Sequence, residues 1–286
     1  MLACVLALDQ RQSACCAGIP FRIRTGTDQK GTSMTGQTPR FTTRLARDDA
    51  DLLAAQRLRY DVFVRELGGD GDLVDHDAGL ERDAFDPHFD HLLLLDESRT
   101  DDQVVGVYRL LRDDQAGHIG RFYSDAEYDL DPLLRSGRKL LELGRSCLHK
   151  DYRGGAGMMV LWQALADYVT QHDIDILFGT ASFHGTDIDA LAHPLSNLHH
   201  RHLVSEDLRV RSKEYQSLNV LPEDQVDRRR AVLETPALIK AYLRLGGAVG
   251  DGAFVDHQFN TTDVCLIMDT QRLNARQKGI YTKDAK

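Results

Sequence analysis

The stretch Leu148-His-Lys-Asp-Tyr-Arg-Gly-Gly-Ala-Gly-Met158 joins a predicted strand to a predicted helix. The strand before it, Lys139–Leu148, alternates side chains between two faces, and the helix after it carries an apolar stripe from Val160 to Val169. Free N–H groups at a helix start attract anions, and glycines let a ligand approach the backbone. The corner is therefore a candidate anion site, with a purely structural turn as the alternative. It is neither a Walker loop nor a dinucleotide fingerprint, because both spacings are missing.

Outward from this corner the chain mixes helical and strand patterns. Helices are predicted over Ala50–Leu67, from Thr186 with Asp189 as capping partner, and after Thr235-Pro236. Gly68-Gly69 and Gly246-Gly247 provide helix stops. The order of elements predicts a mixed α/β fold with some antiparallel pairing. The predicted strands are His91–Leu95, Val104–Leu111, a weaker His118–Tyr123, Lys139–Leu148, Ile174–Phe178, Phe254–Phe259 and Val264–Met268.

Length and composition exclude several classes of protein. The chain has 286 residues, 42% hydrophobic and 28% charged, which is ordinary for a globular protein. No apolar run approaches the ~20 residues that span a bilayer. The formal net charge of −9 argues against general nucleic-acid binding, and five scattered cysteines suit a reducing cytosol. Residues 1–40 read as a disordered tail or an over-extended start, and 41–286 as a single domain. A chain starting at Met34 is expected to fold and act like the full chain.

Charge is unevenly distributed along the chain. From Asp61 to Asp102 there are fourteen acids and three bases, and from Arg135 to Arg153 six bases and two acids. A solvated surface explains either block. The alternative is two fields of opposite sign, the acidic one attracting a cation and the basic one an anionic partner.

A second set of residues is more specific than the corner. It comprises Arg59 and Phe63 four apart on the first helix, the loop acids Glu81, Asp83 and Asp86, Arg109 on a strand, and Glu142 with Arg145 on the longest strand. This order and spacing resemble acyl-homoserine-lactone synthases, which have the GCN5-related N-acetyltransferase fold. The tryptophan expected after the first helix is absent. At the corner, Arg153 and Gly154–Gly157 stand where that fold has its pyrophosphate loop.

The chain resembles more closely the L-ornithine Nα-acyltransferases, GCN5-like proteins often labelled hemolysin-like. The likeness covers about residues 41–270. It implies a mixed sheet flanked by helices, and transfer of a 3-hydroxy fatty acyl group from acyl carrier protein to the α-amine of ornithine. It is carried by Leu-Arg-Tyr-Asp-Val-Phe (58–63), Phe-Asp-His-Leu-Leu-Leu-Leu-Asp (89–96), Tyr-Arg-Leu-Leu-Arg (108–112), Leu-Leu-Glu-Leu-Gly-Arg-Ser-Cys (140–147), residues 174–183 and 194–200, and Gly-Asp-Gly-Ala-Phe-Val-Asp-His-Gln-Phe-Asn-Thr-Thr-Asp-Val-Cys (250–265).

Amide formation from a thioester needs a neutral amine and a polarised carbonyl. Glu142 is the candidate base or amine-orienting group, with Arg145 and Arg109 beside it; a structural ion pair is its alternative. Arg59, Arg109 or Arg145 would bind the ornithine carboxylate. Four further residues are expected to bind the substrate: Phe63, Glu81, Asp83 and Asp86. The three acids among them would bind the side-chain ammonium of ornithine. The residues expected to bind the donor are Lys150, Arg153, Gly154 and Gly155.

The resemblance implies no tightly bound cofactor and no metal, with the phosphopantetheine thioester of acyl carrier protein as donor substrate. The histidines between 184 and 202 lack a familiar zinc spacing, so we expect them to be structural. The expected location is the cytoplasm, with peripheral contact to the inner membrane kept open. The rival functions are acyl-homoserine-lactone synthesis, a membrane-acting hemolysin-like protein, and a non-catalytic binding module.

Glu142 and Arg145 are three apart on one predicted strand, so their side chains start on opposite faces. A shared function therefore requires a distortion of the strand. We expect a β-bulge near Gly144 that turns both side chains toward one cleft.

Overall fold

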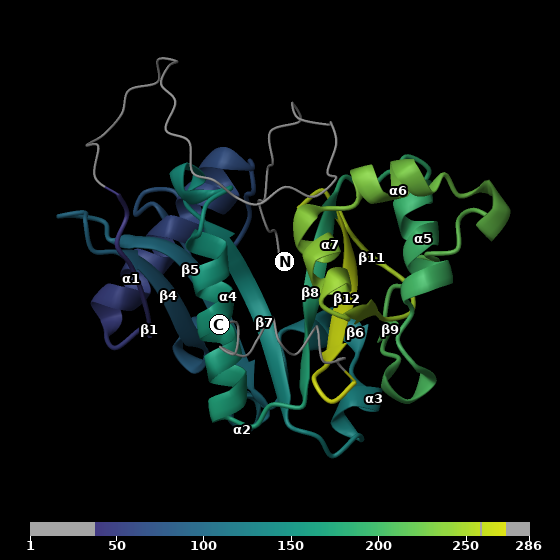
Figure 1. The fold of residues 1–286 in the computed structure, drawn as a ribbon, viewed down its shortest axis with the longest axis horizontal. Coiled ribbons are helices and arrows are strands. Elements are labelled where there is room, and N and C mark those ends of the chain that lie inside the picture. Colours follow the sequence, from purple (N-terminus) through teal and green to yellow (C-terminus); the bar gives the residue numbers. More distant parts are fainter. Residues whose placement is uncertain (1–37, 258, 273–286) are drawn as a thin grey trace, which may run out of the picture.

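The computed structural model describes residues 38–257 and 259–272, arranged around one eight-stranded sheet (Figure 1). The strands lie in the order β1-β4-β5-β7-β8-β12-β10, and β11 also pairs with β12. Every pairing is antiparallel except that of β7 with β8. The bounds are β1 Phe41–Leu45, β4 Asp90–Asp96, β5 Val104–Arg112, β7 Leu140–Leu148, β8 Ile176–His184, β10 Ala248–Val249, β11 Phe254–Asp256 and β12 Thr261–Asp269, with two small sheets formed by β2 Val74–Asp75 with β3 Leu80–Glu81 and by β6 Tyr128–Asp129 with β9 Arg211–Ser212.

Helices cover both faces of the sheet, so the predicted mixed α/β fold is confirmed. Helices α4 and α7 pack on one face, where Leu161 and Leu165 of α4 join the largest apolar cluster. Helix α1 packs on the other face against β5 and β7. Within the described residues no helix is long and apolar enough to span a bilayer. The helices are α1 Asp49–Arg59, α2 Asp113–Ile119, α3 Asp131–Leu134, α4 Gly157–Gln171, α5 Ala192–His202, α6 Arg228–Glu234 and α7 Ala237–Arg244.

Strands β7 and β8 run side by side only at their beginnings. The parallel pairing joins Leu140–Glu142 to Ile176–Phe178, and both strands continue well beyond it. Figure 1 shows the two strands diverging from there. We call the point where they part, after Glu142 and Phe178, the strand fork.

The predicted bulge is present on β7. Arg109 of β5 faces Gly144, whereas Val107 faces Cys147, so β7 has one residue more than β5 over this interval. Arg145 lies inside the bulge with φ of +49°, a left-handed conformation that is uncommon for a residue with a side chain.

Several predicted elements change length or type. The first helix is α1 followed by a π-helical segment, Tyr60–Glu66, and it stops where predicted because Gly68 adopts φ of +73°. Strand β8 extends past Phe178 to His184, β12 begins at Thr261, and β11 ends at Asp256. Strand β1 was not predicted at all.

Two predictions of local structure are wrong. Residues 118–123 do not form a strand, because helix α2 occupies Asp113–Ile119; the Gln115 side chain accepts the Arg112 N–H at its start, and Gly120 ends it with φ of +86°. The helix expected from Thr186 begins only at Ala192. Before it, the Asp187 carboxylate accepts the N–H groups of Asp189 and Ala190 and holds a turn.

Candidate active site

Three arginines and three acids from distant parts of the chain meet between α1, the loop that carries β3, and strands β5 and β7. Their side chains are at most 6% exposed. The opposite charges are equal in number, so the buried set can be neutral as a whole. We call this set the arginine network; it comprises Arg59, Arg109, Arg145, Glu81, Asp83 and Asp86.

Arg59 ends α1 and uses all of its guanidinium nitrogens inside the protein. Nη1 and Nη2 donate to the two carboxylate oxygens of Asp86 at 2.7 and 2.9 Å. Nε donates to the Glu81 carboxylate, and Nη2 also donates to the Glu81 carbonyl at 2.6 Å. With no exposure and no unused nitrogen, Arg59 is poorly placed to bind the carboxylate of a substrate.

The other two arginines connect the same acids to the sheet. Arg109 Nη1 donates to Asp83 Oδ2 at 2.7 Å and to Asp86 Oδ1 at 2.9 Å. Arg145 Nε donates to Glu81 Oε1 at 3.0 Å. Arg109 differs from Arg59, because its Nε and Nη2 have no hydrogen-bond partner among the described residues. Arg109 therefore keeps two donors that meet no acceptor in the described part of the chain.

The network holds its acids in the charged form. Burial alone would raise the pKa of Glu81, but Arg145 and Arg59 lower it to about 2. Burial likewise opposes ionisation of Asp86, and Arg59 still brings its pKa below the ordinary value. Because Glu81, Asp83 and Asp86 already pair with arginines, the structure does not favour the expectation that they receive the ammonium of a substrate.

Glu142 is the last residue of β7 before the strand fork, and it is buried. Its Oε2 accepts the Tyr123 N–H at 2.7 Å, and its Oε1 accepts the N–H of Ser124 at 2.6 Å and the Ser124 hydroxyl. Burial raises the pKa of Glu142, and the bonds from Ser124 and Tyr123 oppose that rise. Two carboxylate oxygens offer about four acceptor positions, so about one remains for a substrate.

The bulge brings Glu142 and Arg145 to one small cavity, as predicted from their spacing. The cavity measures about 10 Å³ and is also lined by Arg109, Tyr123 and Thr180. A space of that size holds roughly one water molecule. Arg145 Nη2 donates to the Tyr123 hydroxyl at 3.2 Å, and its charge lowers the pKa of that phenol. At the strand fork the cavity is thus lined by the side of the Arg109 guanidinium that meets no described acceptor, the Glu142 carboxylate and the Tyr123 phenol.

Two further buried acids, Glu127 and Asp263, were not predicted from the sequence. Glu127 precedes β6, and Asp263 lies on β12 opposite Ser182 of β8. Both Asp263 oxygens and Glu127 Oε2 lack a hydrogen-bond partner among the described residues. The available signal was a carboxylate inside an otherwise apolar strand pattern, Thr261–Met268.

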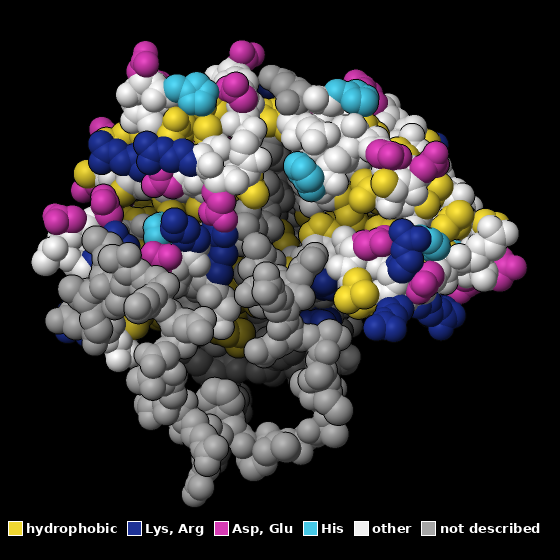
Figure 2. All heavy atoms as spheres, turned by 90° about the horizontal axis from the view of Figure 1, so that it is seen from above, with side chains coloured by type: hydrophobic (Ala, Val, Ile, Leu, Met, Phe, Trp, Pro, Cys, Tyr) yellow, Lys and Arg dark blue, Asp and Glu magenta, His cyan; other side chains and the backbone are white. Residues whose placement is uncertain are grey.

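The Gly-rich corner has the predicted strand–turn–helix form. Gly154 adopts φ of +75°, and α4 begins at Gly157. Arg153 Nε and Nη2 donate to the Leu148 carbonyl, and its other contacts are with the Glu66 carboxylate. Arg153 is therefore largely committed to the protein, whereas Lys150 is exposed. Over the face seen in Figure 2, the coloured Lys and Arg side chains are interspersed with Asp and Glu rather than gathered in one field.

Phe63 and the histidines between 184 and 202 are not members of the arginine network. Phe63 is buried in the apolar cluster under α1, so its contact with a substrate stays a prediction. His193 Nδ1 accepts the Asp227 N–H at 3.1 Å, and His200 contacts the Leu221 carbonyl at 2.9 Å. In the part of the chain that the structure describes, no group of three or more His, Cys, Asp or Glu side chains could hold a metal ion.

Comparison with known proteins identifies relatives of this chain. Residues 58–163 match a family model described as an acetyltransferase (GNAT) domain. Among solved structures, the chain is similar to FeeM, an N-acyl amino acid synthase from uncultured soil microbes, with 11% identity, a TM-score of 0.46, and coverage of 82% of this chain and 93% of the other.

Curated relatives are much closer in sequence. The L-ornithine Nα-acyltransferase of Rhodobacter capsulatus is 59% identical over 243 residues, which is 84% of this chain and 94% of the relative. The enzyme of the same name from Brucella abortus is 40% identical over 249 residues, covering 85% of this chain and 89% of the relative. The resemblance drawn from the sequence motifs is thereby confirmed: the chain belongs to the L-ornithine Nα-acyltransferase family.

Proposed function

We propose that this chain transfers a 3-hydroxy fatty acyl group from the thioester of acyl carrier protein to the α-amine of L-ornithine, the first step of ornithine-lipid synthesis. The carrying observation is the 59% identity, over 94% of the relative's length, to a protein named L-ornithine Nα-acyltransferase. The site supports it, since a carboxylate and an arginine with free donors meet at the strand fork.

The reaction forms a C–N bond and breaks the C–S bond of the thioester. The amine nitrogen loses a proton on attack, and the departing thiolate gains one. In our proposal Glu142 orients the α-amine through its remaining acceptor position and takes the proton. Glu142 needs little rearrangement to do this, because the N–H groups of Tyr123 and Ser124 already fix its carboxylate.

The ornithine carboxylate binds Arg109 in this proposal. Arg109 Nε and Nη2 have no partner among the described residues, and they are charge-assisted donors of the kind that bind carboxylates. Arg145 does not need to touch the substrate for this to work. Its bonds to Glu81 and Tyr123 instead hold the bulge and the wall of the cavity.

The donor approaches the strand fork from the Gly-rich corner. Lys150 is the exposed cation there, and Gly154 and Gly155 leave the backbone open, with no side chain to block a phosphopantetheine arm. Arg153 contributes by holding the corner on β7 through the Leu148 carbonyl. We also propose that the membrane surface is touched only as the lipid product leaves.

The experiment is to express the chain in a host that makes no aminolipids and to identify new lipids by mass spectrometry. A lyso-ornithine lipid is the expected product. In a matched assay with purified chain, 3-hydroxyacyl-acyl carrier protein should support turnover better than the same acyl group on coenzyme A. An acylated homoserine lactone, or an acylated amino acid other than ornithine, would contradict the proposal.

A further inference from the structure

The most unusual feature outside the mechanism above is the pair of buried acids Glu127 and Asp263. Glu127 is 7% exposed and Asp263 is not exposed at all. Among the described residues, neither forms an ion pair, and three of their four carboxylate oxygens lack a hydrogen-bond partner. Burying an unpaired carboxylate is costly, so proteins usually satisfy each one with a cation or with donors.

The fold holds the chain segments of these two acids in place by hydrogen bonds to main-chain carbonyls. The Tyr128 hydroxyl donates to the Asp263 carbonyl at 2.9 Å and to the Gly252 carbonyl at 3.1 Å. The Lys213 N–H donates to the Glu127 carbonyl at 2.8 Å. Residues 127 and 128 are therefore fixed against β12, although they lie more than a hundred positions away in the sequence. These bonds therefore fix the backbone of Glu127 near Asp263.

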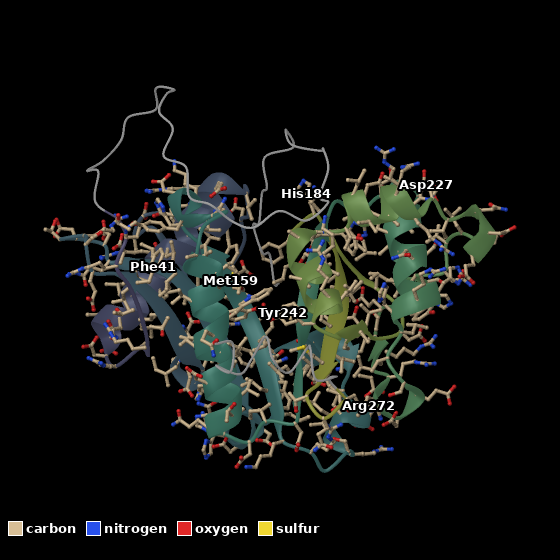
Figure 3. The ribbon with its side chains drawn as sticks, viewed as in Figure 1. Phe41, Met159, His184, Asp227, Tyr242 and Arg272 are labelled. Carbon is tan, nitrogen blue, oxygen red and sulfur yellow. The ribbon has the colours of Figure 1, made fainter. Side chains whose placement is uncertain are left out.

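Two hydroxyl groups also lie near the pair. Thr261 Oγ1 and Ser182 Oγ make no hydrogen bond to any described residue, and Thr261 is 6% exposed. Ser182 faces Asp263 across the two strands, and Thr261 pairs with His184, which Figure 3 labels at the end of β8. Both hydroxyls lie near enough to Asp263 to lower its pKa, although burial raises it overall.

The pair lies on the same face of the sheet as the proposed active site. Side chains two apart on a strand share a face, and so do paired residues on neighbouring strands. Glu142 pairs with Phe178, and Phe178 shares its face with Ser182, which pairs with Asp263. The negative charge of Glu142 adds to those of Asp263 and Asp256, which, together with burial, raise the pKa of Glu127. A substrate held by Glu142 therefore extends toward two acids that form no ion pair with any described residue.

We infer that Glu127 and Asp263 bind the side-chain ammonium group of the amino acid substrate, with the hydroxyls of Thr261 and Ser182 completing its hydrogen bonds. This rests on the proposed function. An ammonium group has three donors and one positive charge, which suits two carboxylates with free oxygens and adjacent hydroxyls. The pair would then select a diamino acid over one with an apolar side chain, because the apolar side chain would leave both carboxylates buried and unpaired.

The test compares ornithine with norvaline, which has the same carbon chain without the terminal amine. We expect the wild-type chain to prefer ornithine strongly in kcat/KM. In Glu127→Gln and in Asp263→Asn, ornithine turnover should fall by roughly 10²–10³-fold while norvaline turnover changes little, so the preference collapses. Direct calorimetric titration of both amino acids should show the same loss for ornithine alone.

Asp269→Asn is the matched control. Asp269 lies at the other end of β12 and pairs with Arg138 at 2.7 Å, so its loss should lower the melting temperature without changing the preference. The Glu127 and Asp263 variants should melt no lower than the wild-type chain, because each removes an unpaired buried charge. A large drop in their melting temperature would indicate a structural role instead.

The outcomes separate the two proposals. If the wild-type chain acylates ornithine and norvaline equally well, or if both variants lose both substrates in parallel, the ammonium site is wrong and acyl transfer stands. If the wild-type chain acylates neither, the proposed function itself fails.

Discussion

Arg59 and Asp86 face each other through two hydrogen bonds of 2.7 and 2.9 Å, with both side chains shielded from solvent. The pair joins the last residue of α1 to the loop that follows β3. Gln56 also donates to Asp86, at 2.9 Å, from one turn earlier on α1. A single acid thus fixes the acidic loop to the helix above the sheet, and the loop in turn supplies Glu81 and Asp83 to the other arginines.

Arg59→Met should destabilise the fold strongly. It leaves Asp86 buried without its main cation and removes one of the cations that pair with Glu81. Breaking a buried pair in this way typically lowers the free energy of unfolding by about 3–5 kcal/mol. Urea denaturation gives the measurement. The control is Arg65→Met, which removes an exposed partner of Asp61 and should cost no more than about 0.5 kcal/mol. Similar values for both variants would show that the arginine network contributes little stability.

Acid should unfold the protein as the network loses its carboxylate charges. Arg145, Arg59 and Arg109 outweigh the effect of burial and lower the pKa of Glu81 from 4.5 to about 2. A carboxylate whose pKa is lower in the folded state stabilises the fold above its unfolded pKa and loses that effect as pH falls toward the folded value. Stability should therefore decline between about pH 4.5 and 2. In Glu81→Gln the denaturation midpoint should vary less with pH over this window; an unchanged slope would contradict the assignment.

His91 should affect stability in a separate pH range. Burial lowers its pKa, so the unfolded chain takes up a proton that the folded chain resists, and stability should begin to fall below about pH 6.5. Its ring nitrogen contacts the Asp86 carbonyl, and Arg59 and Arg109 also face it. The two declines can be distinguished by comparing His91→Gln with Glu81→Gln across both ranges.

Local pattern was sufficient for the elements that build the site. The strand Leu140–Leu148, the Gly-rich corner and helix α4 follow from periodicity and from glycine placement, and the bulge at Gly144 follows from the spacing of Glu142 and Arg145. Helix α2 was missed because its start depends on Gln115 accepting the Arg112 N–H, which is a capping role that the residue types rarely signal.

Long-range pairing was not predictable from one sequence. The acidic block from 61 to 102 reads as a solvated surface, yet Glu81, Asp83 and Asp86 are neutralised by arginines from α1, β5 and β7. The block and its partners are separated in the chain, so charge counting within a window cannot detect the match. Asp263 was not recognised as a candidate site residue for the same reason. The hydroxyl that bonds to its carbonyl belongs to Tyr128, which is far away in the sequence.

Lys150→Glu should weaken donor binding specifically. Lys150 is exposed at the corner, so reversing its charge should raise the KM for acyl carrier protein, flatten the salt dependence and leave the melting temperature unchanged. Lys139→Glu, at the opposite end of β7, is the control and should leave that KM unaltered. Arg153→Glu should behave differently and lower stability, because Arg153 bonds to Glu66 and to the Leu148 carbonyl. A change in the KM for ornithine instead of the donor would place Lys150 in the other pocket.

Arg145→Lys should reduce activity although the charge is kept. Arg145 reaches Glu81 with Nε and the Tyr123 hydroxyl with Nη2, two directions that a single ammonium cannot cover. Steady-state kinetics should show a lower kcat, with a smaller change in donor KM. Tyr123→Phe, which removes only the second of these contacts, should lose less. Equal kcat for Arg145→Lys and the wild-type chain would mean that charge alone is required there.

Glu142→Gln should separate the proposed base role from a structural one. The variant removes the charge, and its amide NH₂ must face one of the N–H groups of Tyr123 and Ser124, so a modest drop in melting temperature is expected. If the carboxylate takes the proton of the amine, kcat should also fall by roughly 10²–10⁴-fold. Turnover close to normal, with donor and ornithine binding intact, would leave Glu142 as a support for residues 123 and 124.

Ser124→Ala provides the matched test, because it keeps the Glu142 carboxylate and removes one of its donors. The bond from Ser124 lowers the pKa of Glu142 against the effect of burial, so its loss should raise that pKa further. A base is active above its pKa, and the acid limb of the pH–rate profile should therefore move to higher pH in Ser124→Ala. Arg109, which also faces Glu142, and Glu127 nearby are unchanged in this variant. An acid limb that stays in place while kcat at high pH is retained would show that another group takes the proton.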